Sequence, residues 1–69
     1  MAHEEYLRRN LIHCTAVGVQ ANLGAAIDRL RASKRPPKWL LKMLEGIRER
    51  AERVTPEVAK WRNDAPDAP

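Results

Sequence analysis

The sequence predicts an all-α protein: a long helix, a Pro-Pro turn and a second, antiparallel helix that together form a helical hairpin. Apolar residues recur at helical spacing on both sides of the turn, and the adjacent prolines Pro36 and Pro37 separate the two periodic stretches. A chain of 69 residues has room for one domain. We therefore expect a single hairpin domain over residues 1–62 and a flexible tail over residues 63–69.

The first helix is expected over residues 3–33, which contain no proline. Its apolar side chains recur every three or four residues and so share one face of a helix. This stripe consists of Ile12, Ala16, Val19, Leu23, Ile27 and Leu30. A helix of about 30 residues is roughly 45 Å long, so we expect it to need packing beyond one short neighbouring helix.

The second helix is expected over residues 37–54, because a proline suits the first helical position, where an N–H group would have no partner. A heptad-like seam runs along it: Leu40, Leu44, Ile47, Ala51 and Val54. Thr55 and Pro56 are typical of an N-cap followed by a first-turn proline. They predict a short third helix over residues 56–62. The last residues hold two prolines and no apolar anchor, and are expected to fray.

The composition indicates that this hairpin needs a partner. A chain of this length buries only about 60% of the surface that it exposes when unfolded. Small domains of this kind usually add disulfides, a metal or a second subunit, and Cys14 is the single cysteine. A lone cysteine and the lack of a signal-peptide pattern predict a cytoplasmic protein. The longest stretch without Asp, Glu, Lys, Arg or His, residues 14–27, is too short for a membrane span, which takes about 20 apolar residues.

No group of residues predicts catalysis, a metal site or a cofactor. His13 and Cys14 are neighbours, but adjacent helical residues point about 100° apart, and no third group is placed to orient the imidazole. Leu7 stands where a zinc-protease helix that begins at His3 needs its second histidine. We therefore do not expect an enzyme.

A row of small residues on the first helix predicts the contact with a second copy of the chain. Small side chains let two helix backbones approach closely, and the row lies beside the stripe that the second helix covers. Two leucines continue the row, so the predicted dimer interface is Leu7, Leu11, Cys14, Gly18, Ala21 and Ala25. A homodimer with two-fold symmetry is the simplest outcome. The alternative is a monomeric three-helix bundle in which the third helix covers the row.

A cluster of cations around the turn predicts the surface that binds a partner. The net charge of +4 suits an acidic protein or nucleic acid. The predicted partner-binding residues are Arg29, Arg31, Lys34, Arg35, Lys38, Trp39 and Lys42. Trp39 is either an exposed anchor, because Trp and Arg dominate interface hot spots, or a core residue. Nucleic acid is the less favoured partner, because no nucleic-acid-binding motif accompanies the cations.

The small-residue-rich first helix, the turn Lys34-Arg35-Pro36-Pro37-Lys38-Trp39 and the charged stretch from Glu45 to Arg53 together resemble the small host-takeover proteins of temperate phages. In particular, they resemble the quorum-sensing anti-activator type. The resemblance implies a compact helical dimer that binds and disables a larger host protein, such as a transcription activator or an ATPase motor. Two other functions fit the residues: a small basic nucleic-acid-binding protein that uses the turn, and an antitoxin or regulatory subunit that folds on its partner.

Overall fold

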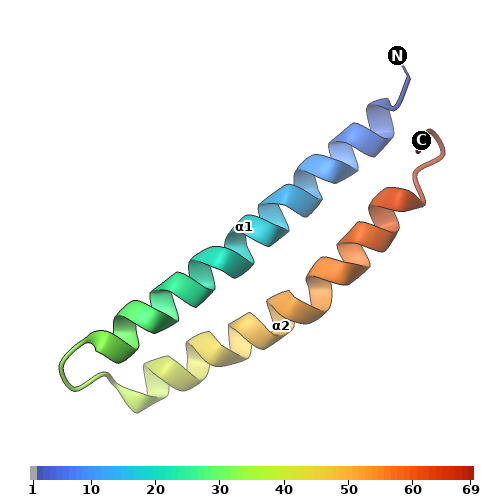
Figure 1. Cartoon of the computed structure of the whole chain (residues 1–69). Helices are drawn as coiled ribbons and strands as arrows, with labels where there is room; N and C mark the ends of the chain where they lie inside the picture. Colours follow the sequence, from blue (N-terminus) through green and yellow to red (C-terminus); the bar gives the residue numbers. More distant parts are fainter. Residues whose placement is uncertain (1) are drawn as a thin grey trace.

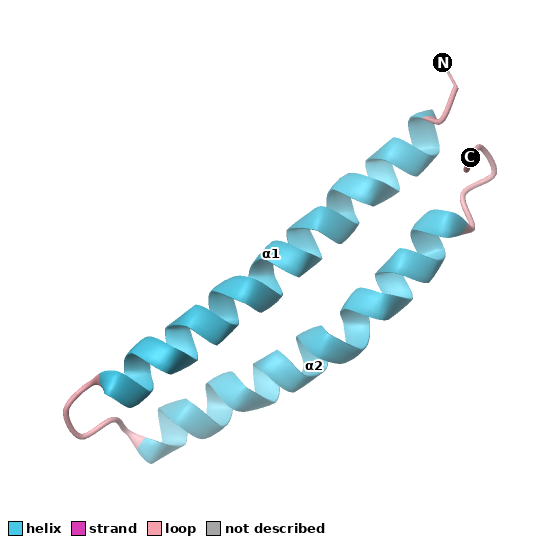
Figure 2. Ribbon diagram, viewed as in Figure 1, coloured by secondary structure: helices cyan, strands magenta, loops and turns pink. Residues whose placement is uncertain are grey.

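The computed structural model describes residues 2–69, which form two helices, α1 (Glu4–Ala32) and α2 (Lys38–Asn63). The helices run antiparallel and side by side, so the two termini lie at the same end of the molecule (Figure 1). Only short loops and turns accompany them in this part of the chain, and no strand is present there (Figure 2). The expected all-α hairpin is confirmed, and α1 begins and ends within one residue of the expected helix.

Helix α2 is longer than the sequence predicted. It continues through Pro56 to Asn63, so the expectation of a separate helix over residues 56–62 is corrected. The apolar positions explain why the helix does not break. Ala51 and Val58 are both half-buried and lie one helical repeat of seven residues apart, on the side that faces α1.

The proline nevertheless changes the local geometry of α2. Pro56 has no N–H group to donate to the carbonyl of Glu52, and its ring crowds that carbonyl. The Thr55 hydroxyl donates a hydrogen bond of 2.7 Å to the carbonyl oxygen of Ala51, a bond that often accompanies a bend. Figure 1 shows α2 curved in this region, whereas α1 is nearly straight.

The turn between the helices is closed by local polar contacts. The Ser33 hydroxyl donates to the carbonyl oxygen of Arg29 (3.0 Å), which satisfies one of the last carbonyls of α1. Arg35 adopts the left-handed backbone conformation with φ of 50°, so the chain reverses there without a glycine. Arg31 and Glu45 form an ion pair of 2.6 Å between α1 and α2 beside the turn.

The C-terminal residues, expected to be a flexible tail, instead cap the start of α1. His3 precedes α1 with φ of 65° and offers no side-chain cap to the helix. The carboxylate of Asp67 takes that place: it accepts hydrogen bonds from the backbone N–H groups of Glu5 (2.8 Å) and Tyr6 (2.9 Å). The first N–H groups of a helix have no partner within it, and acidic side chains are the preferred ones there. His3 Nδ1 lies 2.6 Å from the backbone oxygen of Asp67. That oxygen can only accept, so Nδ1 carries the proton.

Helix α1 in turn caps the end of α2. Arg9 donates to the carbonyl oxygen of Trp61 (2.7 Å), one of the last carbonyls of α2, and its guanidinium lies 4.5 Å from the centre of the Trp61 ring. Arg62 donates to the side-chain oxygen of Asn10 (3.1 Å) in the opposite direction. We call the residues that cap the two helices at this end the terminal latch: His3, Glu5, Tyr6, Arg9, Trp61 and Asp67.

The hairpin is a single layer of helices with very little interior. It measures 53 × 16 × 11 Å, and its radius of gyration is 15.9 Å, whereas a compact domain of this length has a value of roughly 11 Å. Ile27 is the one large side chain of residues 2–69 that is fully buried. Neither helix, over the residues that the structure describes, carries an apolar stretch long enough to cross a membrane.

Candidate functional site

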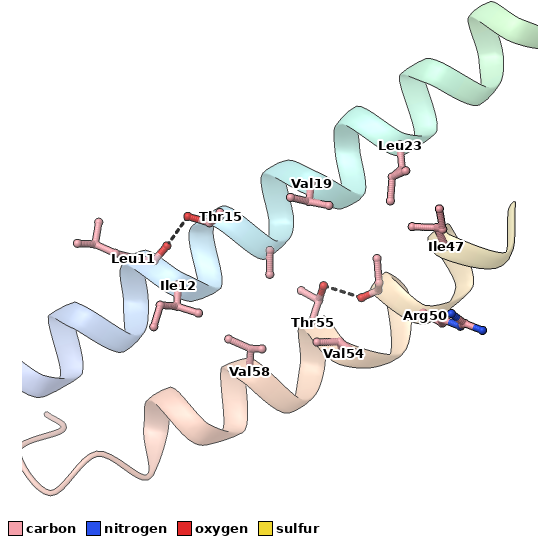
Figure 3. A pocket seen from close by; sticks show the side chains of 12 residues that line it. Leu11, Ile12, Thr15, Val19, Leu23, Ile47, Arg50, Val54, Thr55 and Val58 are labelled. Carbon is pink, nitrogen blue, oxygen red and sulfur yellow. Dashed lines mark hydrogen bonds between the residues drawn. The ribbon is translucent and has the colours of Figure 1, made fainter. Parts of the chain in front are cut away.

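The main surface feature is an open apolar groove of about 600 Å³ that runs between the two helices. Its α1 wall consists of Leu11, Ile12, Thr15, Ala16, Val19 and Leu23. Its α2 wall consists of Ile47, Arg50, Ala51, Val54, Thr55 and Val58. Figure 3 shows Ile12 and Leu23 directed toward α2, and Ile47 and Val58 directed toward α1.

The polar side chains of the groove walls are bonded to their own helix or turned away from the groove. Both threonine hydroxyls donate to carbonyl oxygens of their own helix, Thr15 to Leu11 (2.9 Å) and Thr55 to Ala51 (2.7 Å). Arg50 is the remaining polar wall residue, and Figure 3 shows its guanidinium turned away from the groove. An occupant therefore meets methyl and methylene groups, so the groove is suited to apolar side chains.

Exposed apolar side chains extend this surface along the whole of α2. The large exposed hydrophobic residues of this helix are Trp39, Met43, Ile47, Val54 and Trp61. Their spacing of 4, 4, 7 and 7 residues places them on one side of the helix, and two of them line the groove. With three exposed residues of the α1 wall they form what we call the apolar face: Leu11, Ile12, Val19, Trp39, Met43, Ile47, Val54 and Trp61.

The small-residue row lies on a different side of α1. All six predicted interface residues are exposed, and a Cβ added at Gly18 would meet no atom within 4 Å. Only Leu11 belongs both to the row and to the groove. The structure thus leaves the row uncovered, and its role in dimerisation stays a prediction. The alternative was a third helix folded over the row. The described chain contains no such helix.

The basic cluster is exposed around the turn, as its composition suggests. Arg31 is held by its ion pair with Glu45, whereas the other cations of the cluster make no ion pair with any of residues 2–69. Trp39 is 65% exposed, so the reading of Trp39 as a core residue is wrong. The cluster therefore presents free cations beside one exposed indole ring.

His13 and Cys14, the adjacent pair considered in the sequence, both lie on α1. His13 Nδ1 lies 3.4 Å from the guanidinium of Arg62, and Cys14 is exposed on α1. Between residues 2 and 69, no three His, Cys, Asp or Glu side chains lie close enough to hold a metal ion.

The charge state of the terminal latch is set by its hydrogen bonds. Burial by itself raises the pKa of the Asp67 carboxyl, but the backbone N–H groups of Glu5 and Tyr6 and the charge of His3 outweigh it. The pKa of Asp67 is therefore held below its ordinary value, and the carboxylate stays ionised as a cap at neutral pH.

Sequence reasoning named most residues of the groove but not the groove itself. The expected stripe on α1 contains Val19 and the expected seam on α2 contains Val54, and the second helix was expected to cover the stripe. In the structure these two side chains are about half exposed. Periodicity gives the direction of each side chain but not the distance between two helices, so it carries no signal for an open groove.

The fold and the groove together define a class, a helical hairpin with one uncovered apolar face. Comparison with models of known families, with curated proteins and with solved structures found no match to the chain.

Proposed function

We propose that this chain is a small non-enzymatic protein-binding module that works as a homodimer and masks a larger host protein. The observation that supports this function best is the uneven burial of its apolar side chains. Eight of the ten large exposed hydrophobic residues belong to the apolar face, and one large side chain is fully buried. Exposed apolar surface gathered on one side is typical of proteins that bind other proteins.

The basic cluster is the proposed contact with the host protein. Its free cations favour an acidic surface on the target, and complementary charge raises the rate and specificity of association. Trp39 supplies a large apolar ring at the same place, and a Trp beside cations is a common centre of binding energy. The resemblance to phage anti-activators supports a transcription activator or an ATPase motor as the target, bound and masked in a fixed stoichiometry.

Photo-crosslinking in living cells of the native host tests this function. A photoreactive amino acid is placed at Trp39 or, as the control, at Val17, which is exposed on α1 away from the basic cluster. We expect a discrete adduct with one larger protein from position 39 alone. Lys38→Glu combined with Lys42→Glu should remove that adduct, because the charge of the surface is reversed. Identical adducts from both positions, or none, would contradict the proposal.

The exposed cations beside Trp39 also favour a second candidate function, the binding of nucleic acid, because aromatic rings stack on bases and cations hold phosphates. Such binding weakens steeply as salt is raised, since each neutralised phosphate releases a counterion. A gel-shift titration with single-stranded and duplex DNA separates the two candidates. Retarded DNA at low salt that is released at physiological salt would favour nucleic acid, and the absence of retardation at low salt would eliminate it.

A further inference from the structure

We infer that the groove part of the apolar face is covered by a second copy of the chain, packed antiparallel to form a four-helix bundle whose end leaves Trp39 exposed. This inference rests on the dimer in the proposed function and names its interface and orientation. It places the second copy on the groove side of the hairpin and not on the small-residue row. It does not depend on the identity of the host protein.

The surface area of the hairpin is the first argument. The chain exposes 5436 Å², whereas a folded monomer of 7.9 kDa exposes roughly 4,400 Å². The excess is about 1,000 Å². A standard protein interface buries about 800 Å² on each partner. One further chain, seated on one face, is therefore enough to bring the exposed surface into the usual range.

The thickness of the hairpin is the second argument. Its backbone extends only 11 Å in the shortest dimension, because the two helices lie side by side in a single layer. Stable domains consist of two or more packed layers around a core. A second hairpin supplies a second layer of two helices of the same length. Two hairpins packed in this way form a four-helix bundle. A two-fold axis covers the grooves of both copies at once.

The chemistry of the groove excludes a charged occupant and fits this chain. Its walls are apolar, its hydroxyls are already bonded, and the guanidinium of Arg50 points away. The exposed residues that would enter from the other copy are those of the same apolar face, such as Val19, Ile47 and Val54. The small-residue row offers less, because small side chains bury little area unless backbones come into close contact.

The charges at the two ends of the hairpin decide the orientation. Residues 28–42, at the turn, hold six Lys and Arg against one Asp. Residues 2–10 and 57–69, at the terminal latch, hold five Asp and Glu against four Lys and Arg. A parallel dimer places two strongly basic turns together, where like charges repel. An antiparallel dimer places each turn beside the latch end of the other copy, which carries the carboxylates.

The mass of the purified full-length chain tests the interface. At micromolar concentration we expect light scattering to give twice the chain mass of 7.9 kDa. Val19→Glu places an unpaired charge in the buried centre of the bundle and should raise the dimer Kd at least about 100-fold. A wild-type chain that is monomeric and helical at this concentration would overturn the inference.

Val17→Glu is the matched control. Val17 is 46% exposed and Val19 is 49% exposed, both on α1, but Val17 lies outside the groove. We expect the Val17→Glu protein to remain a dimer, with circular dichroism to check that each variant stays helical. Ala21→Glu compares the two candidate faces. If this variant dissociates the dimer and Val19→Glu does not, the small-residue row is the interface and the inference is wrong.

A distance measurement tests the orientation without disturbing the core. Spin labels are attached at Lys34→Cys at the turn, in a Cys14→Ser background. An antiparallel dimer separates the two labels by a distance comparable with the 53 Å length of the hairpin, whereas a parallel dimer brings them within about its 16 Å width. A short distance would overturn the antiparallel arrangement.

The two proposals can fail separately. A monomeric chain that still gives the adduct from position 39 contradicts the four-helix bundle and leaves the masking function in place. A dimer with the expected label distance but no such adduct supports the four-helix bundle and contradicts the masking function.

Discussion

The terminal latch and the groove differ in how far their side chains find partners within the chain. In the latch, polar groups more than fifty residues apart in the sequence bond to each other: Asp67 with Glu5 and Tyr6, and Arg9 with Trp61. In the groove, apolar residues of the two helices face each other and stay about half exposed. The hairpin therefore completes its hydrogen bonds within one chain but not its hydrophobic core.

This difference separates the contacts that set the shape of the hairpin from the apolar burial that the hairpin leaves incomplete. A typical hydrogen bond contributes only about 0.5–1.5 kcal/mol net, but its direction fixes how the helix ends meet. Full burial of a large apolar side chain contributes about 1.5–3 kcal/mol, and most of that stabilisation is unused on the apolar face. The latch thus holds the hairpin in register, and the larger part of the available apolar stabilisation would come from the second copy that we propose.

The largest expected effect comes from the one place where the core is closed. Ile27→Ala should lower the free energy of unfolding by about 2–5 kcal/mol, because it removes a fully buried side chain and leaves a cavity. Urea unfolding followed by circular dichroism measures it, with Val17→Ala as an exposed control expected to change by less than about 0.5 kcal/mol.

Val19→Ala sharpens this comparison, since Val19 lies on the same α1 stripe as Ile27 but in the open groove. In dilute solution its effect should be much smaller than that of Ile27→Ala and should grow with protein concentration. Equal effects at every concentration would show that the groove is closed within a single chain.

The next effect concerns the bend of α2 beside the groove. Pro56→Ala restores the missing N–H donor and removes the crowding of the Glu52 carbonyl, so it should stabilise the chain by about 1–3 kcal/mol. Thermal unfolding measures the change. Pro37→Ala is the control, because a proline at the start of a helix displaces no helical hydrogen bond. A loss of stability at position 56 would mean that the bend is needed for packing.

A smaller effect is expected at the terminal latch. Asp67→Ala removes the acceptor for two backbone N–H groups, so the amides of Glu5 and Tyr6 should exchange hydrogen faster, and unfolding should become easier. Hydrogen exchange measured by NMR reads these two amides directly. Asp64→Ala, three residues earlier on the same terminal segment, should leave them unchanged. Unaltered exchange in the Asp67 variant would show that the tail does not cap α1 in solution.

The smallest effect is the pH dependence of that contact. The pKa of Asp67 is lower in the folded chain than its ordinary value of 3.8, so folding favours the ionised form. Its stabilisation is complete above that ordinary value and is lost as the pH falls through the lower, folded pKa. Unfolding between pH 5 and pH 2 should therefore show an acid-induced loss that is reduced in Asp67→Asn. Parallel curves for the two proteins would contradict the role of this carboxylate.

Much of the fold could be predicted from local pattern. The period of apolar residues gave α1 to within one residue, and the adjacent prolines placed the turn. The same local reasoning failed at Pro56. The pattern of an N-cap followed by a first-turn proline predicts a helix start, but it is also compatible with a helix that continues. There the half-buried Ala51 and Val58 pack against α1 on both sides of the proline and keep α2 continuous.

The sequence by itself determined two helices, a turn and the basic cluster, because these follow from spacing, proline chemistry and composition over short stretches. Only the tertiary structure decided the terminal latch and the groove. Asp67 caps a helix that begins more than sixty residues earlier, and a cap of this kind leaves no local pattern. The groove depends on how far apart two helices lie, a distance that no single helix encodes.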